Sequence, residues 1–188
     1  MGVAVRIIGI DPSLAATGLA VIDIESSRVV AWRCIRTKPT DDFLKTHDFA
    51  RRLAEIALEV RMFCAAYPGI IAVEGQVGAS MGKASIANVG KLMAAYGAVI
   101  GALPSRPLIV LPSIVKKRVG KMADASKGEC FANAMVTLHG VPAEYPSGGR
   151  AAKEAVEDAV CVALAAMPEV EQVLALTGGT ALRGNAAI

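Results

Sequence analysis

The chain has 188 residues, of which 54% are hydrophobic, 20% charged and only 4% aromatic, and its formal net charge is +3. This composition excludes an intrinsically disordered chain, and the length predicts one globular domain that buries roughly 70% of its unfolded surface. The small net charge does not identify a nucleic-acid-binding protein, so the local distribution of charge is more informative.

Cysteine spacing and the apolar segments exclude several other classes. The four cysteines form no CxxC pair and have no zinc-like spacing. They are Cys34, Cys64, Cys130 and Cys161. Apolar runs such as Leu92–Leu103 contain glycines and fall short of the roughly 20 residues that a membrane span needs. We expect a soluble cytoplasmic protein with reduced single thiols, no cleaved leader and no membrane contact.

The first part of the chain predicts three strands joined by short turns. Val3–Ile10 is a Val- and Ile-rich run that ends at Asp11, which a proline follows. Gly18–Ile24 and Arg28–Arg36 have the same character, with a hairpin turn between them. Short connections favour antiparallel neighbours, so we expect an antiparallel meander.

The rest of the chain alternates helical and extended patterns. The expected elements are a helix over Thr40–Tyr67, a strand over Ile70–Val73, a glycine-rich loop over Gly75–Lys83, a helix over Ser85–Leu103, a strand over Pro107–Leu111, and helices over Ser126–Leu138 and Arg150–Met167. This order predicts an α/β fold with a five-stranded mixed sheet and helices on both faces. We place one domain at residues 1–166 and a partly disordered tail at residues 167–188.

Two acidic residues follow predicted strands directly. Asp11 ends the first strand and Glu74 ends the fourth. If these strands are parallel neighbours, strand spacing places the two side chains within about 5–8 Å on one sheet edge, where ligands of such sheets bind. Two carboxylates that close repel each other unless a cation lies between them.

A third acid comes from the last predicted helix. Asp158 precedes an apolar run, so we expect it to be partly buried. Glu154 lies one turn earlier on the same face, whereas Glu157 is turned by about 100°. Each acid has an ordinary alternative: a turn or cap for Asp11, a surface position for Glu74, a solvated charge or salt bridge for Asp158. The three together point to a site for hard divalent cations, and a pair of such ions can cleave phosphodiesters.

Basic residues cluster between the last predicted strand and the final helix. They are Lys116, Lys117, Arg118, Lys121 and Lys127. Next to an acidic metal site, such a cluster favours contacts with nucleic-acid phosphates, and the alternative is a solvated loop face. Lys83 and Lys91 would extend the path. With few aromatic residues nearby, shape and phosphate recognition are favoured over base stacking.

Small residues recur at intervals of three and four in the helix Ser85–Leu103. They are Gly90, Ala94, Gly97 and Gly101. Each glycine costs a helix about 1 kcal/mol relative to alanine, so a packing reason is expected. The stripe can pack against this chain or against a partner helix. The two histidines, His47 and His139, are isolated and are interpreted as structural or surface residues.

Several motifs resemble RuvC-type Holliday junction resolvases of the ribonuclease H-like superfamily. The similar segments, in chain order, are Gly9-Ile10-Asp11-Pro12-Ser13 with Thr17-Gly18, then Cys34-Ile35-Arg36-Thr37-Lys38, Ala72-Val73-Glu74, the helix with Asn88, Lys91, Gly97 and Gly101, Pro112-Ser113 with Val115-Lys116-Lys117 and Lys127, and Glu157-Asp158-Ala159 with Ala163-Leu164. The resemblance spans about residues 5–166, and the ordered set is more specific than any single motif.

The resemblance implies a ribonuclease H-like nuclease that resolves four-way DNA junctions by paired cuts. Asp11, Glu74 and Asp158 would bind Mg²⁺ or Mn²⁺, as two ions per active site, and Lys116 and Lys127 would contact the scissile phosphate region. The helix at residues 85–103 would form a two-fold dimer interface. Branched DNA is then the expected partner, without a nucleotide cofactor, in a bacterial cytoplasm.

The sequence departs from the family pattern at two places. Ala155 stands where the family places a fourth acid or a histidine, three residues before the last aspartate. We expect Glu154 to substitute, as a catalytic and metal-binding residue, with Glu157 as the second choice. The family's aromatic wedge is also absent, since the segment after Glu74 has Val77, Gly78 and Met81. A broader substrate range and a phage-type member would fit these departures.

Two other functions compete with junction resolution. One is a nuclease of the same fold that acts on other branched DNA or on RNA. The other is a non-catalytic scaffold, because actin-like kinases and related scaffolds also begin with a strand followed by Asp and a Thr-Gly pair. Those kinases need two such domains and a nucleotide cleft, for which 188 residues are too few.

Overall fold

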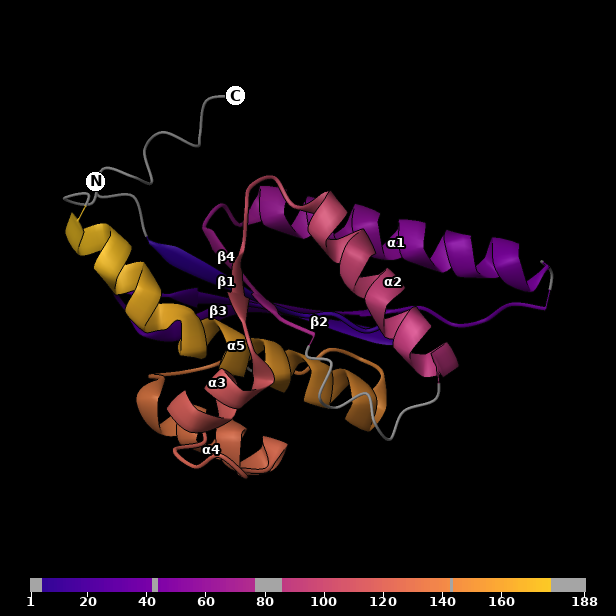
Figure 1. Ribbon diagram of the computed structural model, residues 1–188. Helices are drawn as coiled ribbons and strands as arrows, with labels where there is room; N and C mark the ends of the chain where they lie inside the picture. Colours follow the sequence, from indigo (N-terminus) through magenta and orange to yellow (C-terminus); the bar gives the residue numbers. More distant parts are fainter. Residues whose placement is uncertain (1–4, 42–43, 77–85, 143, 177–188) are drawn as a thin grey trace.

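A computed structural model describes residues 5–41, 44–76, 86–142 and 144–176. One five-stranded sheet with the order β3-β2-β1-β4-β5 forms its centre (Figure 1). The strands are β1 (Arg6–Asp11), β2 (Ala16–Asp23), β3 (Arg28–Arg36), β4 (Ile70–Glu74) and β5 (Leu108–Val110). The pairs β1–β2 and β2–β3 are antiparallel, whereas β1–β4 and β4–β5 are parallel. The predicted mixed sheet with an antiparallel first half is therefore confirmed.

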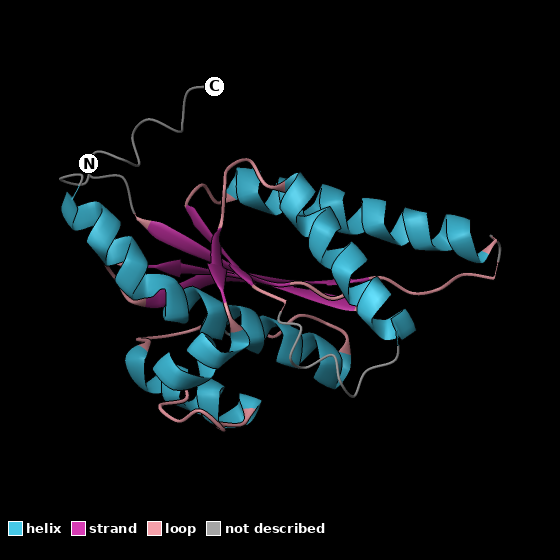
Figure 2. Cartoon of the chain, viewed as in Figure 1, coloured by secondary structure: helices cyan, strands magenta, loops and turns pink. Residues whose placement is uncertain are grey.

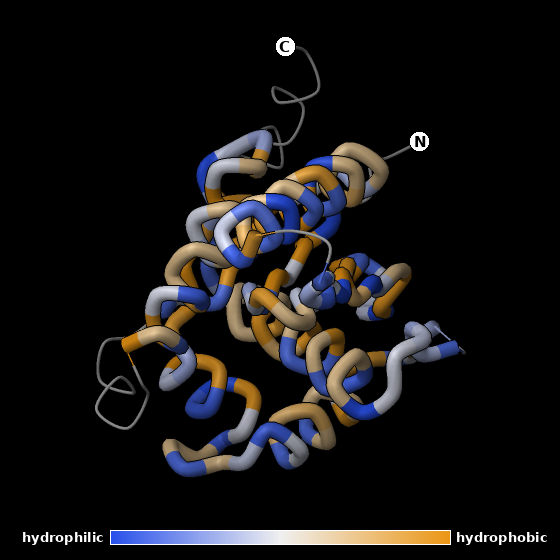
Figure 3. The backbone as a smooth tube through the Cα atoms, turned by 90° about the vertical axis from the view of Figure 1, so that its right-hand side faces the viewer, coloured by the Kyte–Doolittle hydropathy of each residue, from blue (hydrophilic) through white to orange (hydrophobic). Residues whose placement is uncertain are grey.

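Helices cover both faces of the sheet, also as predicted (Figure 2). The helices are α1 (Lys45–Ala66), α2 (Ile86–Ala102), α3 (Pro112–Arg118), α4 (Lys127–Thr137) and α5 (Gly149–Leu176). Because side chains alternate across a strand, Ile8 and Ile10 pack with α1 and α2, while Ile7 packs with α5. Polar and apolar residues alternate along the helices, as expected when one side of each faces the core (Figure 3).

The backbone of α5 lies directly on β1 and β2 at two glycines. A Cβ atom at Gly9 would lie under 3.0 Å from the Ala159 carbonyl, and one at Gly18 equally close to the Ala155 carbonyl, a separation that real Cβ atoms essentially never show. Only glycine permits this approach. The contact fixes the middle of α5 beside the Asp11 end of β1.

Three expected boundaries were wrong. The segment after Pro112 was expected to be an irregular basic stretch, but it forms α3, with proline at the start of the helix, where its missing N–H costs nothing. The helix α5 continues past Met167 and Pro168 to Leu176, because Val170 still packs in the core. The division into a domain over residues 1–166 and a tail over residues 167–188 stays a prediction, and residues 177–188 lie outside the described part. At the other end, α1 begins at Lys45 rather than Thr40.

Among the described helices, α5 is long and apolar enough to cross a membrane by length and composition. Half of its most apolar window is buried inside the protein, however. A core helix of a globular domain gives the same pattern, and the contacts of α5 with β1, β2 and β4 identify it as one.

Candidate active site

Two carboxylates stand side by side at the carboxyl end of the sheet. The parallel pair Ile10–Val73 is the last in register between β1 and β4. Asp11 and Glu74 are the next residues on their strands, and an interstrand spacing of about 4.8 Å brings their side chains together. The predicted neighbourhood of Asp11 and Glu74 is therefore confirmed.

Asp158 enters the same place from α5. It lies between Ala155 and Ala159, the two residues whose carbonyls face Gly18 and Gly9. Its side chain is only 16% exposed. The same glycine contacts that seat α5 on the sheet thus bring the third carboxylate to the ends of β1 and β4.

The three carboxylates affect each other's protonation. Burial, followed by repulsion from Glu74 and Asp158, holds the pKa of Asp11 well above its usual range. Burial also raises the pKa of Glu74, although a hydrogen bond from the Asp11 carboxyl lowers it. Burial raises the pKa of Asp158, and Lys127 acts against that shift. Without a metal ion, burial and mutual repulsion therefore disfavour the charged form of all three acids.

Lys127 supplies a positive charge at this cluster. It is the first residue of α4, which begins with a capping box between Ser126 and Glu129. Its Nζ donates to Asp158 Oδ2, and its side chain is 73% exposed. Lys127 therefore lies at the solvent-exposed side of the site. There its amine could bind a phosphate in place of the Asp158 carboxylate.

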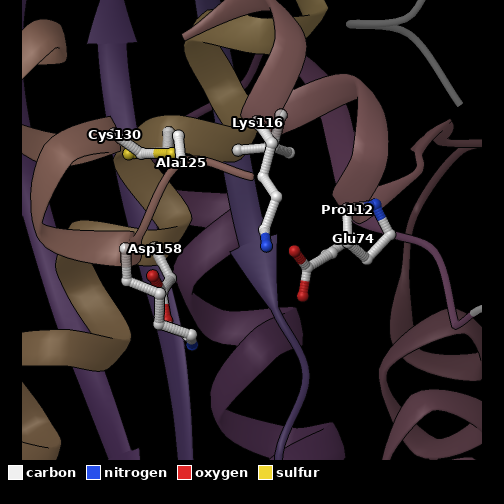
Figure 4. A pocket seen from close by; sticks show the side chains of 9 residues that line it. Glu74, Pro112, Lys116, Ala125, Cys130 and Asp158 are labelled. Carbon is white, nitrogen blue, oxygen red and sulfur yellow. Dashed lines mark hydrogen bonds and ion pairs between the residues drawn. The ribbon is translucent and has the colours of Figure 1, made fainter. Parts of the chain in front are cut away.

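A cavity of about 160 Å³ opens beside the cluster. Its lining residues are Glu74, Pro112, Val115, Lys116, Ala125, Lys127, Cys130, Asp158 and Cys161. The amine of Lys116 reaches down from α3 into the space between Glu74 and Asp158 (Figure 4). The cavity is thus lined by both carboxylates and amines, a combination that suits a phosphate bound to metal ions and to the protein.

The residues fit Mg²⁺ or Mn²⁺ by their donor chemistry. All three acids are oxygen donors, the ligand type that hard divalent cations prefer, and their mutual repulsion favours a bound cation. Within the described ranges, no three His, Cys, Asp or Glu side chains are already arranged around a metal position. In this structure Asp158 is turned toward Lys127 instead.

The candidates for a fourth ligand are engaged elsewhere. Glu154 Oε1 accepts from Arg150 at 2.6 Å, and Glu157 Oε1 accepts from the Tyr145 hydroxyl at 3.1 Å. Ala155 is buried against Gly18. Both glutamates are therefore bonded to other side chains, although the charge of Glu154 still acts on Asp158 and raises its pKa. A ligand role for those two remains a prediction.

The predicted basic residues within the described part of the chain divide into three groups. Lys116 and Lys127 line the cavity. Lys91, Lys117 and Lys121 are exposed on the surface. Arg118 donates to the Ala165 carbonyl and to Glu169, so its guanidinium is committed to α5. Lys83, like Val77, Gly78 and Met81 of the absent aromatic wedge, lies outside the described residues.

The glycine stripe on α2 does not serve packing within the described part of the chain. A Cβ added to Gly90, Gly97 or Gly101 would meet no atom within 4 Å. The residues of α2 that pack on the core are Ala95, Val99 and Ala102. Among the described residues, nothing packs closely on these glycines.

Sequence reasoning missed several residues around the site. Cys161 and Cys130 were interpreted as isolated thiols, yet both line the cavity. A signal existed for Cys161, because it follows Asp158 by three residues and so shares its helix face. Nothing in the sequence places Cys130 at the same cavity as Cys161, since that arrangement depends on how α4 packs on α5.

Comparison with known proteins gives one relative in sequence and several in structure. The chain matches no model of a known protein family. It is 37% identical to the crossover junction endodeoxyribonuclease RuvC of Neisseria gonorrhoeae over 112 residues, which cover 58% of this chain and 57% of that protein. The match thus spans little more than half the length of this curated relative.

Solved structures match over most of the chain. A structure of Thermus thermophilus RuvC aligns with a TM-score of 0.69 and 21% identity, covering 89% of this chain and 96% of that one. RuvC of T. thermophilus in complex with a Holliday junction substrate aligns with a TM-score of 0.68, 20% identity and coverages of 90% and 96%. The yeast mitochondrial resolvase Ydc2 gives 0.58, 10% identity and coverages of 93% and 84%. The chain is therefore similar to RuvC in sequence over part of its length and shares the fold of RuvC-type Holliday junction resolvases, as its motifs predicted.

Metal-free protein is expected to lose stability as pH rises above about 5. The raised pKa values of Asp11, Glu74 and Asp158 mean that the folded state binds more protons than the unfolded state above the ordinary carboxyl range, so unfolding becomes easier as pH rises. Carboxyls with lowered pKa, such as Asp48, change stability only below that range. Thermal unfolding in EDTA from pH 5 to 8 should show a falling Tm. Mg²⁺ should remove the fall, and a pH-independent Tm in EDTA would contradict the expectation.

Proposed function

We propose that this protein is a metal-dependent endonuclease that resolves four-way DNA junctions by paired phosphodiester hydrolysis. The observation that carries the proposal is the meeting of Asp11, Glu74 and Asp158, from three separate elements, beside a cavity with two lysines. Homology to RuvC supports the choice of substrate. The T. thermophilus relative, whose fold this chain shares, was solved with a Holliday junction substrate.

The chain's own groups would bind and orient the scissile phosphate. Asp11, Glu74 and Asp158 would hold two Mg²⁺ or Mn²⁺ ions, which when bound supply an activated water and stabilise the leaving oxygen. Lys116 would place its amine against a phosphate oxygen inside the cavity. Lys127 would release Asp158 and take up a second phosphate contact at the mouth.

Exposed lysines would hold the DNA arms outside the cavity. Lys117 and Lys121 lie on the surface around α3, and Lys91 lies on α2. Such contacts carry no sequence information, but they make binding fall steeply with salt. This arrangement fits a substrate recognised by its branched shape.

We place this activity in a bacterial cytoplasm, where the DNA would be the host's own or a phage's.

We further propose that two copies pair through α2. The exposed stripe of Gly90, Gly97 and Gly101 permits a close helix approach, and Met93 beside it is 45% exposed. A two-fold pair would present two active sites to the two strands of a symmetric junction.

Replacing Met93 with Asp should therefore convert a dimer into a monomer. A charge in a closely packed apolar interface costs several kcal/mol without a partner. Light scattering coupled to size exclusion at micromolar concentration measures the state. Met62→Asp is the matched control, because Met62 is an exposed methionine on another helix, 54% exposed on α1. A Met93→Asp protein that stays dimeric would reject this interface.

A cleavage assay on a synthetic mobile junction tests the main proposal. Strand-by-strand mapping with Mg²⁺ and with Mn²⁺ should give symmetric nicks in two opposing strands. Flaps and RNA–DNA hybrids of equal length serve as competing substrates. Preferred cleavage of those substrates would replace junction resolution with another nuclease activity, and no cleavage together with no metal binding by calorimetry would indicate a non-catalytic scaffold.

A further inference from the structure

A guanidinium group is bound to the turn that follows Asp11. Arg52 of α1 donates from Nε to Thr37 Oγ1 at 2.9 Å, and from Nη2 to the carbonyls of Leu14 and Thr37, both at 3.3 Å. All the hydrogen bonds that the described structure gives Arg52 go to these two residues. Its neighbour Arg51 forms ion pairs with Asp48 and Glu55 and donates to the Lys38 carbonyl at 2.8 Å, and no hydrogen bond joins it to the turn in the described structure.

Thr37 completes the contact from the end of β3. Its side chain is 3% exposed, and its hydroxyl donates to the Leu14 carbonyl while accepting from Arg52. Its backbone N–H donates to the Ala15 carbonyl at 3.3 Å. Arg52 and Thr37 therefore hold two successive carbonyls of the turn between β1 and β2. Together we call these two residues the turn clamp.

The inner side of the same turn is fixed by another buried hydroxyl. Thr17 Oγ1 accepts from the Ser13 N–H at 3.1 Å and donates to the Ser13 carbonyl at 2.6 Å. Thr17 is fully buried. The turn is thus held from both sides by side chains, in a region where regular backbone pairing has ended.

Asp11 depends on this turn because the sheet supports it on one side only. The ladder between β1 and β4 ends at Ile10–Val73, so Asp11 is paired only with Gly18 of β2. The chain then enters the turn directly. Metal-binding carboxylates need placement to within roughly 0.5 Å, which the surrounding residues must supply.

We propose that Arg52 and Thr37 are positioning residues that fix the Asp11 carboxylate by clamping the β1–β2 turn. They act through the turn and touch neither the cavity nor the acids. Burying part of the Arg52 guanidinium costs free energy, even though carbonyls and a hydroxyl accept its hydrogen bonds. If Arg52 served packing alone, an apolar residue would fill the same space without that cost. The inference rests on the proposed nuclease function for its catalytic consequence, but the clamp itself can be measured independently.

The test compares Arg52→Met and Thr37→Val with Arg51→Met. Methionine keeps the length of the arginine stem, and valine keeps the shape of threonine. In single-turnover junction cleavage below the Tm of every variant, both clamp variants should lose about 10–100-fold in rate, the usual effect of losing a supporting contact to a metal ligand. Their Mn²⁺ affinity by calorimetry should weaken about tenfold, while junction affinity measured in Ca²⁺ stays within twofold. Arg51→Met should cleave within threefold of the natural protein.

Rescue and hydrogen exchange separate positioning from general loss of structure. Thr37→Ser restores the hydroxyl and should recover most of the rate. In Arg52→Met, exchange of the Ser13 and Thr37 amides should accelerate, whereas amides in the centre of β2 stay protected. Unchanged exchange in the turn, or unchanged Mn²⁺ affinity with faster exchange, would overturn the proposal. If the natural protein neither binds Mn²⁺ nor cleaves any substrate, the nuclease function fails, and the exchange comparison still decides whether the clamp exists.

Discussion

Replacing Asp11 with Asn should abolish junction cleavage while junction binding survives. Both other acids repel the charged form of Asp11 and raise its pKa, so we expect Asp11 to contact both metal positions. An amide oxygen is a weaker ligand for a hard cation and carries no charge. We expect a loss of at least about 10³-fold in single-turnover rate, the scale on which removing a main electrostatic contact acts. Junction affinity in Ca²⁺ should change less than threefold, because the lysines supply it.

The same substitution should make the metal-free protein more stable. Burial and two neighbouring carboxylates disfavour the charged form of Asp11, and an amide removes that penalty. The Tm in EDTA at pH 8 should therefore rise, and its dependence on pH should become flatter. Mg²⁺ should raise the Tm of the natural protein more than that of the variant.

A matched control distinguishes this site from charge effects in general. Asp124→Asn removes an acid from the exposed basic segment before α4 and should leave cleavage and the pH profile unchanged. Glu154→Gln should cost less than tenfold, because Glu154 is bonded to Arg150 outside the cavity. Full activity of Asp11→Asn would contradict a role for Asp11 in the active site. Equal losses of cleavage rate in Asp11→Asn and Glu154→Gln would indicate that Glu154 is also a ligand.

The sheet could be predicted because its signals are local and strong. Arg28–Arg36 follows a hairpin turn, and both ends of β3 were predicted correctly. Asp-Pro and Pro-Gly pairs mark the ends of β1 and α1. The helix α3 was missed because seven residues give too short a window for periodicity. The end of α5 was misplaced because Pro168 suggests a helix end, whereas the burial of Val170 extends the helix past it.

The acids could be predicted, but most of their surroundings could not. Asp11 and Glu74 follow from the rule that parallel strands present their carboxyl ends on one edge. The ion pair of Lys127 with Asp158 depends on how α4 packs on α5, and the contact of Arg52 with Leu14 depends on the rotation of α1. The spacing of residues along the sequence predicts neither the packing of α4 on α5 nor the rotation of α1. The bond of Glu154 to Arg150 is different, because the two residues are four apart on one helix and local spacing could have predicted their pairing.

Replacing Gly18 with Ala should be among the most destabilising single changes in the molecule. The added Cβ would fall within 3.0 Å of the carbonyl carbon and oxygen of Ala155. These are backbone atoms of a helix that packs on all five strands of the sheet, so they cannot turn aside as a side chain would. Overpacking of a core usually costs 1–3 kcal/mol, and a clash with fixed backbone should lie at or above about 3 kcal/mol. For a domain of this size that corresponds to a fall in Tm of roughly 6–12 °C.

Unfolding of this variant can be followed through Trp32, the only tryptophan in the chain. Its ring stacks on Tyr145 at 4.6 Å between centroids, and its indole N–H donates to the Glu144 carbonyl, so its fluorescence reports on the packing beside α5. Gly128→Ala is the control, because a Cβ there meets nothing within 4 Å and alanine favours a helix. The control should keep or raise the Tm. If Gly18→Ala unfolds at the same temperature as the control, α5 does not rest on the backbone of β2, and the placement of Asp158 beside Asp11 loses its structural basis.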